Sequence, residues 1–134
     1  MGTTIHHVAI VVEDLDQALT FYRDALGLEM TERAEMPEEG VEMAFLPTGE
    51  GEIELVRPLD AESGVGRFLQ KRGEGLHHLC LRVDDIDAAV ARLRAAGAQL
   101  LSEGAQLRDD GTRYIFIHPR SAHGVLLELY EVPE

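Results

Sequence analysis

The sequence predicts an α+β fold built from two tandem β-α-β-β-β modules, and three features of the chain lead to this prediction. Residues 5–16 (IHHVAIVVEDLD) have a second copy at residues 76–87 (LHHLCLRVDDID). Each copy is a nearly continuous apolar run, typical of a covered strand, that ends in acidic residues opening a helical pattern. Each helix is followed by short apolar stretches separated by Gly, Pro and Asp, as expected of strands and turns. Because each module alone leaves one sheet face uncovered, we expect a pseudo-twofold axis to relate the two in a curved sheet around a shared interior.

The first module is expected over about residues 4–58. Its opening strand covers Ile5 to Val12, and either Glu13 or Asp14 caps the following helix, which Gly27 ends. Three further strands are expected, with an acidic loop and a Gly-rich turn between them, at residues 28–33, 41–46 and 52–57.

The second module is expected over about residues 75–132 and has the same order of elements. Either Asp84 or Asp85 caps its helix, which Gly97 ends. Its later strands are expected near Leu100 and at residues 112–118 and 125–131. A linker over about residues 62–73 carries a short helical pattern, and residues 1–134 are expected to form one domain.

Composition limits the classes of protein. The 134 residues are 45% hydrophobic and 28% charged, which is typical of a globular domain that can bury a core. The single cysteine, Cys80, lies in an apolar run and is expected to be a small buried hydrophobe. No stretch approaches the roughly 18 apolar residues of a membrane span, and no signal peptide pattern opens the chain. A cytoplasmic protein with no membrane association is therefore expected.

The charge balance bears on possible partners. The formal net charge is -13, and a phosphate backbone would be repelled by such a field, so nucleic acid is not an expected partner. The acidic excess also raises the hypothesis of a high-salt source.

The two His-His pairs differ in their expected surroundings. Alternation along a strand puts His7 on the same face as Ala9, and His78 on the same face as Cys80. These small neighbours leave room beside His7 and His78, whereas His6 and His77 fall on the bulkier faces and are assigned to packing.

Two glutamates in apolar strands require compensation for their charge. Glu54 and Glu128 occupy matching positions in the last strand of each module, once a short insertion in the second module is allowed. With His7 and His78 they offer two imidazoles and two carboxylates, a set that suits one divalent ion such as cobalt, nickel, manganese, iron or zinc. The alternative is that the histidines are core residues and the glutamates lie on a solvated face.

With these residues in place, the chain resembles the vicinal oxygen chelate (glyoxalase/bleomycin resistance) superfamily. Within it, the chain resembles the methylmalonyl-CoA epimerase family in particular. This resemblance is carried by residues 68–78 (FLQKRGEGLHH) and by residues 116–119 (FIHP) leading to residues 123–129 (HGVLLEL). Glyoxalase I relatives usually carry an Asp-Pro-Asp-Gly turn before the last strand, where this chain has residues 118–124 (HPRSAHG).

The resemblance implies a metal-dependent epimerase. His7, Glu54, His78 and Glu128 would hold the ion, and the proton at carbon 2 of methylmalonyl-CoA would be removed through a metal-stabilised enediolate. Glu128 would be one acid or base. Some relatives have a second glutamate at the position of Met43, so Glu42, one residue earlier, is the other candidate. A homodimer is also implied.

Three functions stay open at this point: the epimerase, a glyoxalase I-type lactoylglutathione lyase, and a metal-free small-molecule-binding module. The polyanionic acyl-CoA would need local positive charge. The candidates are Arg67, Lys71, Arg72, Arg108, Arg113 and Arg120, although for each of them a solubilising surface charge is the favoured interpretation. His118 and His123 flank the final turn, where they could stabilise the loop or contact the substrate.

Overall fold

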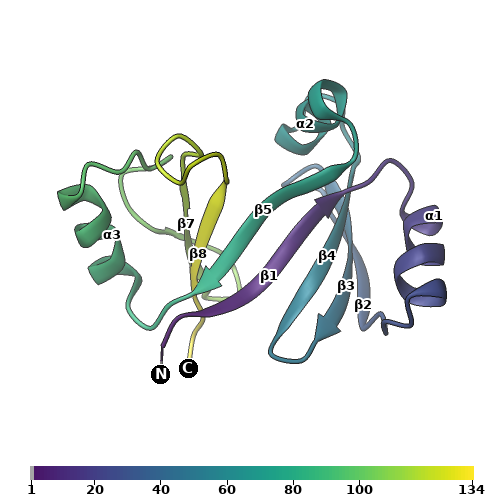
Figure 1. Ribbon diagram of the computed structural model, residues 1–134, viewed down its shortest axis with the longest axis horizontal. Helices are drawn as coiled ribbons and strands as arrows, with labels where there is room; N and C mark the ends of the chain where they lie inside the picture. The colour runs from purple at the N-terminus through teal and green to yellow at the C-terminus, as the bar shows by residue number, and fades with distance from the viewer. Residues whose placement is uncertain (1) are drawn as a thin grey trace. The chain divides into compact units, whose positions relative to one another are not determined.

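The computed structural model describes residues 2–134 and divides into two compact units (Figure 1). The N-terminal unit is His7–His77. The C-terminal unit is His78–Glu134 together with the first residues of the chain up to His6. Each unit holds four strands and a helix that packs on them, which confirms the predicted α+β class and the repeated β-α-β-β-β order.

The strands of the N-terminal unit run in the order β2-β3-β4-β1. Their bounds are β1 (Thr4–Val11), β2 (Glu32–Met36), β3 (Val41–Thr48) and β4 (Gly51–Pro58). β1 pairs in parallel with β4, and the other neighbours are antiparallel. The helical elements are α1 (Leu15–Leu19), its π-helical continuation η1 (Thr20–Ala25) and α2 (Gly64–Arg72).

The C-terminal unit repeats this arrangement in the order β5-β8-β7-β6. Its strands are β5 (Gly75–Arg82), β6 (Gln106–Leu107), β7 (Arg113–Ile117) and β8 (Leu127–Glu131), and its helix is α3 (Ile86–Ala95). β5 and β8 are parallel, as β1 and β4 are, so the two modules share their pairing pattern as well as their sequence pattern.

The predicted helix starts are confirmed, and the structure chooses between the alternative caps. The Asp14 carboxylate accepts a hydrogen bond from the Gln17 N–H at 3.1 Å, and the Asp85 carboxylate accepts one from Ala88 at the same distance. Each satisfies an N–H group that the first helical turn leaves without a partner. The first helix ends before Gly27, as expected, and Gly27 has a φ of 91°. Its second half is π-helical, since the Leu26 N–H donates to the Phe21 carbonyl at 2.8 Å.

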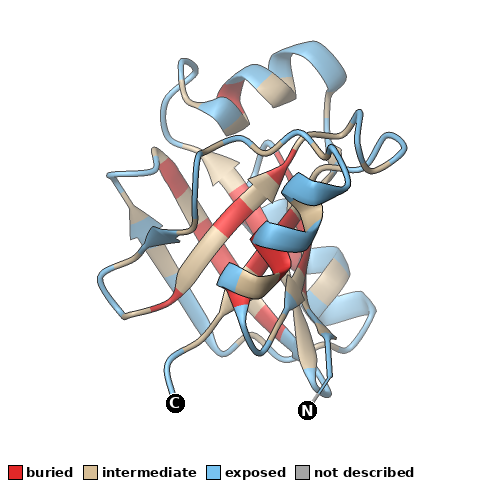
Figure 2. Cartoon of the chain, turned by 90° about the vertical axis from the view of Figure 1, so that its left-hand side faces the viewer, coloured by how far each residue is buried: buried red, intermediate tan, exposed pale blue. Residues whose placement is uncertain are grey.

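Each helix covers one face of its own strands and forms a separate core. Leu15 and Leu19 of α1 pack with Leu46 and Leu55, and Ile86 and the rest of the α3 cluster pack with β7 and β8. Buried residues, red in Figure 2, lie mainly along the strands, whereas the helices show mostly exposed or intermediate positions. The opposite face of the strands carries the candidate site residues, and in the N-terminal unit it also holds a third buried cluster, Ala9, Val41, Met43 and Val56, against which Val65 of α2 packs.

Two strand predictions are wrong in position. The strand expected at residues 28–33 begins only at Glu32, because Leu28 and Met30 pack onto the α1 core instead of pairing along β3. The strand expected near Leu100 is a single bridge to Ile117, and the regular pairing with β7 starts at Gln106.

Among residues 2–134, no helix has the length and apolar character needed to cross a membrane.

Candidate functional site

The first His–Glu pair, His7 and Glu54, lies within the N-terminal unit. The His7 Nδ1 and the Glu54 Oε2 atoms are 3.2 Å apart, and the two side chains are only 1% and 7% exposed. β1 and β4 bring them together because parallel pairing sets Ala9 opposite Glu54, and His7 lies on the same face as Ala9.

The second His–Glu pair, His78 and Glu128, lies within the C-terminal unit. The His78 Nε2 atom is 3.1 Å from the Glu128 Oε1 atom, and the side chains are 12% and 1% exposed. Here Cys80 is the residue opposite Glu128 in the parallel β5–β8 register. The two units therefore place the pair by the same strand register, although His7 faces its glutamate with Nδ1 and His78 with Nε2.

The small residues Ala9 and Cys80 explain how the pairs fit into close-packed strands. Both are completely buried, and each lies beside a glutamate and two residues after the paired histidine. A larger side chain at either position would occupy the space that the histidine ring and the carboxylate share. The buried state of Cys80 agrees with its expected role as a small hydrophobe.

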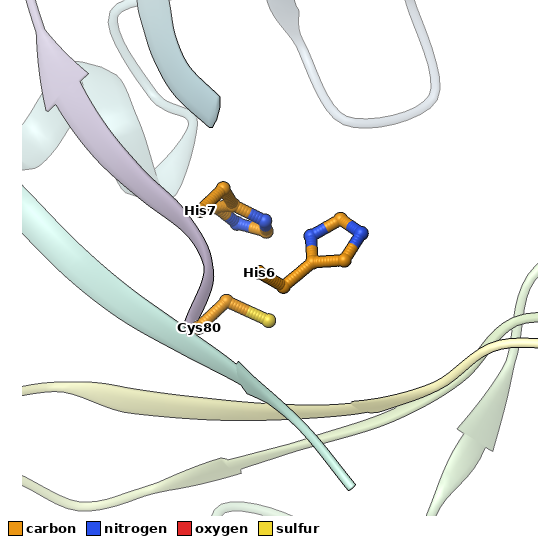
Figure 3. Close-up of side chains that lie close together, drawn as sticks. All are labelled: His6, His7 and Cys80. Atoms are coloured by element: carbon orange, nitrogen blue, oxygen red, sulfur yellow. The ribbon is translucent and has the colours of Figure 1, made fainter. Parts of the chain in front are cut away.

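His6 and His77 make aromatic contacts. The His6 ring lies 4.8 Å from the Tyr130 ring, and the His77 ring lies edge-on at 4.9 Å from Phe68. Figure 3 shows His6 on β1 beside Cys80 on β5, and the possible ligand atoms of these two residues lie within 4.8 Å of one another. These contacts agree with the packing role expected of His6 and His77.

The donor set suits a divalent metal ion. Two ligand atoms about 2.1 Å from one ion, at angles between right and tetrahedral, lie about 3 to 3.4 Å apart. The nitrogen–oxygen separations of 3.2 Å and 3.1 Å fall in that range. A hydrogen bond from an imidazole N–H would suit these distances too, so the fit depends on chemistry: imidazole nitrogen and carboxylate oxygen are ligands that first-row divalent ions accept.

Arg108 takes part in the second pair, although its sequence position suggested only a possible contact to acyl-CoA. Its Nη2 atom donates to the Glu128 Oε2 atom at 3.3 Å. Its guanidinium carbon lies 4.1 Å from the centre of the Tyr114 ring and 5.6 Å from that of Tyr130. Arg108 is therefore held between an aromatic ring and a buried carboxylate.

Several other candidate cations have partners of their own. Arg113 donates to the Asp87 carboxylate at 2.8 and 2.9 Å, and Arg67 donates to the Glu62 carbonyl at 3.2 Å. The Arg72 guanidinium lies over the Phe68 ring at 5.6 Å. For Arg120 the contact is made by the main chain, whose N–H donates to the His118 Nδ1 atom at 2.9 Å.

Glu42 lies on the face of β3 opposite to that of the first His–Glu pair. Phe45 and Met43 share the face of Glu54, because Phe45 pairs with Glu54 and strand alternation puts Met43 on the same side. Glu42 points to the other side, where its carboxylate accepts hydrogen bonds from Arg33 at 3.0 Å and from Arg57 at 3.1 Å. The Arg33 hydrogen bond in particular, with that from Arg57, lowers the pKa of Glu42, although partial burial acts against this. Neither a shifted register nor a bulge brings Glu42 to the face of Glu54.

Sequence reasoning missed two aromatic neighbours of the glutamates. Phe45 is directly opposite Glu54, and Phe116 is directly opposite Glu128. The Phe116 ring also lies edge-on to His78, with 5.4 Å between ring centres. The repeat carried a signal for them, since the two phenylalanines occupy matching positions in the third strand of each module.

Comparisons with known proteins agree across these features. Residues 6–116 match the family described as the glyoxalase/bleomycin resistance protein/dioxygenase superfamily. Mitochondrial methylmalonyl-CoA epimerase from Mus musculus is 42% identical over 126 residues, which is 93% of this chain and 71% of that protein. The crystal structure of methylmalonyl-CoA epimerase from Mycobacterium tuberculosis is 40% identical, with a TM-score of 0.86, over 97% of this chain and 88% of that one.

A methylmalonyl-CoA epimerase solved in complex with methylmalonyl-CoA and NH4+ is 35% identical, with a TM-score of 0.88, over 98% of this chain and 96% of that one. By contrast, a lactoylglutathione lyase from Haemophilus influenzae is 34% identical over 92 residues, 69% of this chain and 67% of that protein.

Proposed function

The chain belongs to the glyoxalase/bleomycin resistance protein/dioxygenase superfamily, and from this membership we propose that it is an epimerase that interconverts the (R) and (S) epimers of methylmalonyl-CoA. The observation that carries the proposal is a buried His–Glu pair in each of two repeated modules, in a chain whose relatives at about 40% identity are methylmalonyl-CoA epimerases. The reaction moves the proton at carbon 2, between the thioester and the carboxylate.

The metal part of the proposal assigns His7, Glu54, His78 and Glu128 to one divalent ion, with cobalt as the first choice and nickel, manganese, iron or zinc as the others. When bound, such an ion acts as a Lewis acid that stabilises negative charge on substrate oxygens. The imidazoles and carboxylates suit these ions better than calcium or magnesium, which prefer oxygen ligands alone.

Glu128 is the residue to which we assign proton transfer. It is 1% exposed, and its Oε1 atom lies beside His78, so the surrounding residues fix the position of its carboxylate. Inversion at carbon 2 needs a proton donor or acceptor near each face of the substrate. Glu42 was the second candidate; its two arginine partners and its place on the other strand face favour a structural role.

The proposal also covers the substrate, the oligomeric state and the location of the protein. The proposed substrate is an acyl-CoA, as in the epimerase solved with methylmalonyl-CoA. We also propose that the chain acts as a cytoplasmic homodimer and folds as one domain, with modules at about residues 4–58 and 75–132 and a linker at about 62–73. Neither nucleic acid nor a membrane is a proposed partner.

Isotope exchange tests the reaction directly. Metal-loaded protein is incubated with a single epimer of methylmalonyl-CoA in deuterated water, beside an assay with methylglyoxal and glutathione. Deuterium at carbon 2 together with loss of optical purity, and no lactoylglutathione, is the expected result. Lactoylglutathione formation without exchange would instead favour the lyase, which uses similar acid–base chemistry on a glutathione adduct.

Metal uptake tests the assigned ligands. Glu54→Ala and Glu128→Ala each remove one carboxylate, and we expect both variants to lose tightly bound metal in elemental analysis. Glu35→Ala, which removes an exposed glutamate of β2, is the matched control and should retain the metal. Wild-type metal content in both site variants would contradict the assignment and return the metal-free binding module to consideration.

A further inference from the structure

The main chain around Arg108 forms a closed turn between β6 and β7. The Arg108 N–H donates to the Thr112 carbonyl at 2.9 Å, and the Gly111 N–H donates to the Arg108 carbonyl at 3.0 Å. The Thr112 N–H in turn donates to the Asp110 carboxylate at 2.9 Å. Gly111 has a φ of 91°, a conformation that favours glycine. These bonds fix the point from which the Arg108 side chain leaves the main chain.

The Arg108 side chain is fixed at its other end by aromatic rings. Tyr114 and Tyr130 face one another in the β7–β8 register, and the guanidinium lies over the first at 4.1 Å and near the second at 5.6 Å. A planar guanidinium stacks on a ring face while its N–H groups stay free to donate in the plane of the group. The stack therefore restricts the direction in which Arg108 can donate.

That direction ends at Glu128. The Arg108 Nη2 atom lies 3.3 Å from the Glu128 Oε2 atom, and the other oxygen, Oε1, lies 3.1 Å from His78. The Oε2 atom of Glu128 thus lies next to the Arg108 guanidinium, and the Oε1 atom lies next to the His78 ring. Glu128 is 1% exposed, so bulk solvent has little access to either oxygen.

We infer that Arg108 is a positioning residue that holds one oxygen of Glu128, so that only the oxygen beside His78 is presented to a metal ion. The inference rests on the proposed metal centre. Groups that hydrogen-bond to a metal ligand orient it, and their removal typically weakens metal binding by about 10- to 100-fold. Without Arg108, Glu128 could rotate and offer both oxygens or neither.

Titration of the full-length, metal-stripped protein with Co2+ tests this inference, with calorimetry for affinity and visible absorption of the bound ion for coordination geometry. The variants are Arg108→Gln, Arg108→Lys, Glu128→Gln and Arg57→Gln. Arg57 is the matched control, because it donates to the largely buried Glu42 carboxylate at 3.1 Å on the other strand face, and its side chain is 34% exposed against 26% for Arg108.

We expect Arg108→Gln to weaken Co2+ binding by about 10- to 100-fold and to change the Co2+ absorption spectrum. Arg108→Lys keeps the charge but loses the planar stack, so we expect a loss of several-fold, which also provides a test if Arg108→Gln does not fold. Arg57→Gln should bind Co2+ as the wild type does. Wild-type affinity and spectrum in both Arg108 variants would overturn the inference.

The same titration distinguishes a failure of the role of Arg108 from a failure of the proposed metal centre. If the wild-type protein does not bind Co2+, or if Glu128→Gln binds it unchanged, the proposed metal centre fails. If the wild type binds tightly, Glu128→Gln does not, and the Arg108 variants equal the wild type, the metal centre stands and only the role of Arg108 fails.

Discussion

At the scale of single residues, three glutamates within strands show three ways of compensating a largely buried carboxylate. Glu54 lies beside His7, Glu128 lies beside His78 and Arg108, and Glu42 lies between Arg33 and Arg57. A charge shielded from water costs free energy unless it is paired. Two guanidinium groups compensate Glu42, whereas the residue beside Glu54 is an imidazole, which in its neutral form binds divalent metal ions.

Glu42→Gln tests the structural role of Glu42. Its pKa is lowered in the folded protein, chiefly by the Arg33 hydrogen bond and also by Arg57. A lowered folded-state pKa contributes stability that is present above the unfolded-state pKa and is lost as the pH falls through the folded-state pKa. We expect the variant to lose about 1 kcal/mol of unfolding free energy at pH 7, and to lose less stability than the wild type on acidification.

Urea unfolding at pH 7 and at decreasing pH measures both effects, and the exchange assay provides the functional readout. Epimerisation within about threefold of the wild-type rate is expected, because Glu42 is on the face opposite to Glu54. A loss of turnover without a loss of stability would show that Glu42 does transfer a proton.

The sequence could identify the candidate ligands because alternation along a strand is a local property. His7 with Ala9, and His78 with Cys80, needed only the order of residues. Arg108 could not be identified in this way. Its contact with Glu128 joins a turn to a strand across 20 positions, and nothing in the local pattern distinguishes it from the other surface arginines.

At the scale of elements, α2 shows how a short helix is fixed at its start. The Ser63 hydroxyl accepts a hydrogen bond from the Gly66 N–H at 3.0 Å and donates one to the Asp60 carbonyl at 2.7 Å. Gly66 is buried against the preceding loop, and a Cβ atom there would lie 2.7 Å from the Ala61 carbonyl oxygen. The loop before α2 and the first turn of α2 therefore form one closely packed unit.

Gly66→Ala should destabilise the protein although alanine is the better helix former. The added methyl group meets main-chain atoms that cannot rotate away, and overpacking of this kind costs about 1 to 3 kcal/mol. Gly64→Ala is the matched control in the same helix: apart from its chain neighbours and the helix's own backbone, no described heavy atom lies within 4 Å of its Cβ position. The change should therefore be neutral or stabilise by up to about 1 kcal/mol. Thermal unfolding of both variants measures the difference. Equal melting temperatures would contradict the packing argument.

The sequence could predict where a helix starts at a capping residue. It could not predict where a strand starts when that depends on pairing with another strand. Asp14 and Asp85, each one of two candidates, cap the helices expected of them, because an N-cap bond is made within three residues. The start of β2 instead depends on its register with β3, where Glu32 pairs with Phe45. Apolar character at Leu28 and Met30 indicated burial correctly but could not distinguish strand pairing from packing on a helix.

At the scale of the whole molecule, duplication gives two units that each complete one His–Glu pair. Parallel pairing of the first and last strands of each module brings the two residues together, β1 with β4 and β5 with β8. Each pair alone offers one nitrogen and one carboxylate, fewer ligands than a tightly bound divalent ion takes. The sequence repeat could predict this equivalence, since it preserves both strand order and face.

The net negative charge of the chain determines how its stability should respond to salt. With 25 acidic against 12 basic residues, the folded chain repels itself, and added salt screens this repulsion. Salt also weakens attractive pairs such as Arg113 with Asp87, but exposed pairs contribute little, so the net charge of -13 should decide the sign. We expect unfolding free energy to rise by roughly 1 kcal/mol, or about 4 °C in Tm, between low and molar NaCl. Chloride is preferable to sulfate, which stabilises proteins by exclusion from their surface. If Tm is unchanged or falls across this range, self-repulsion does not limit stability, and the acidic composition is no sign of adaptation to a saline interior.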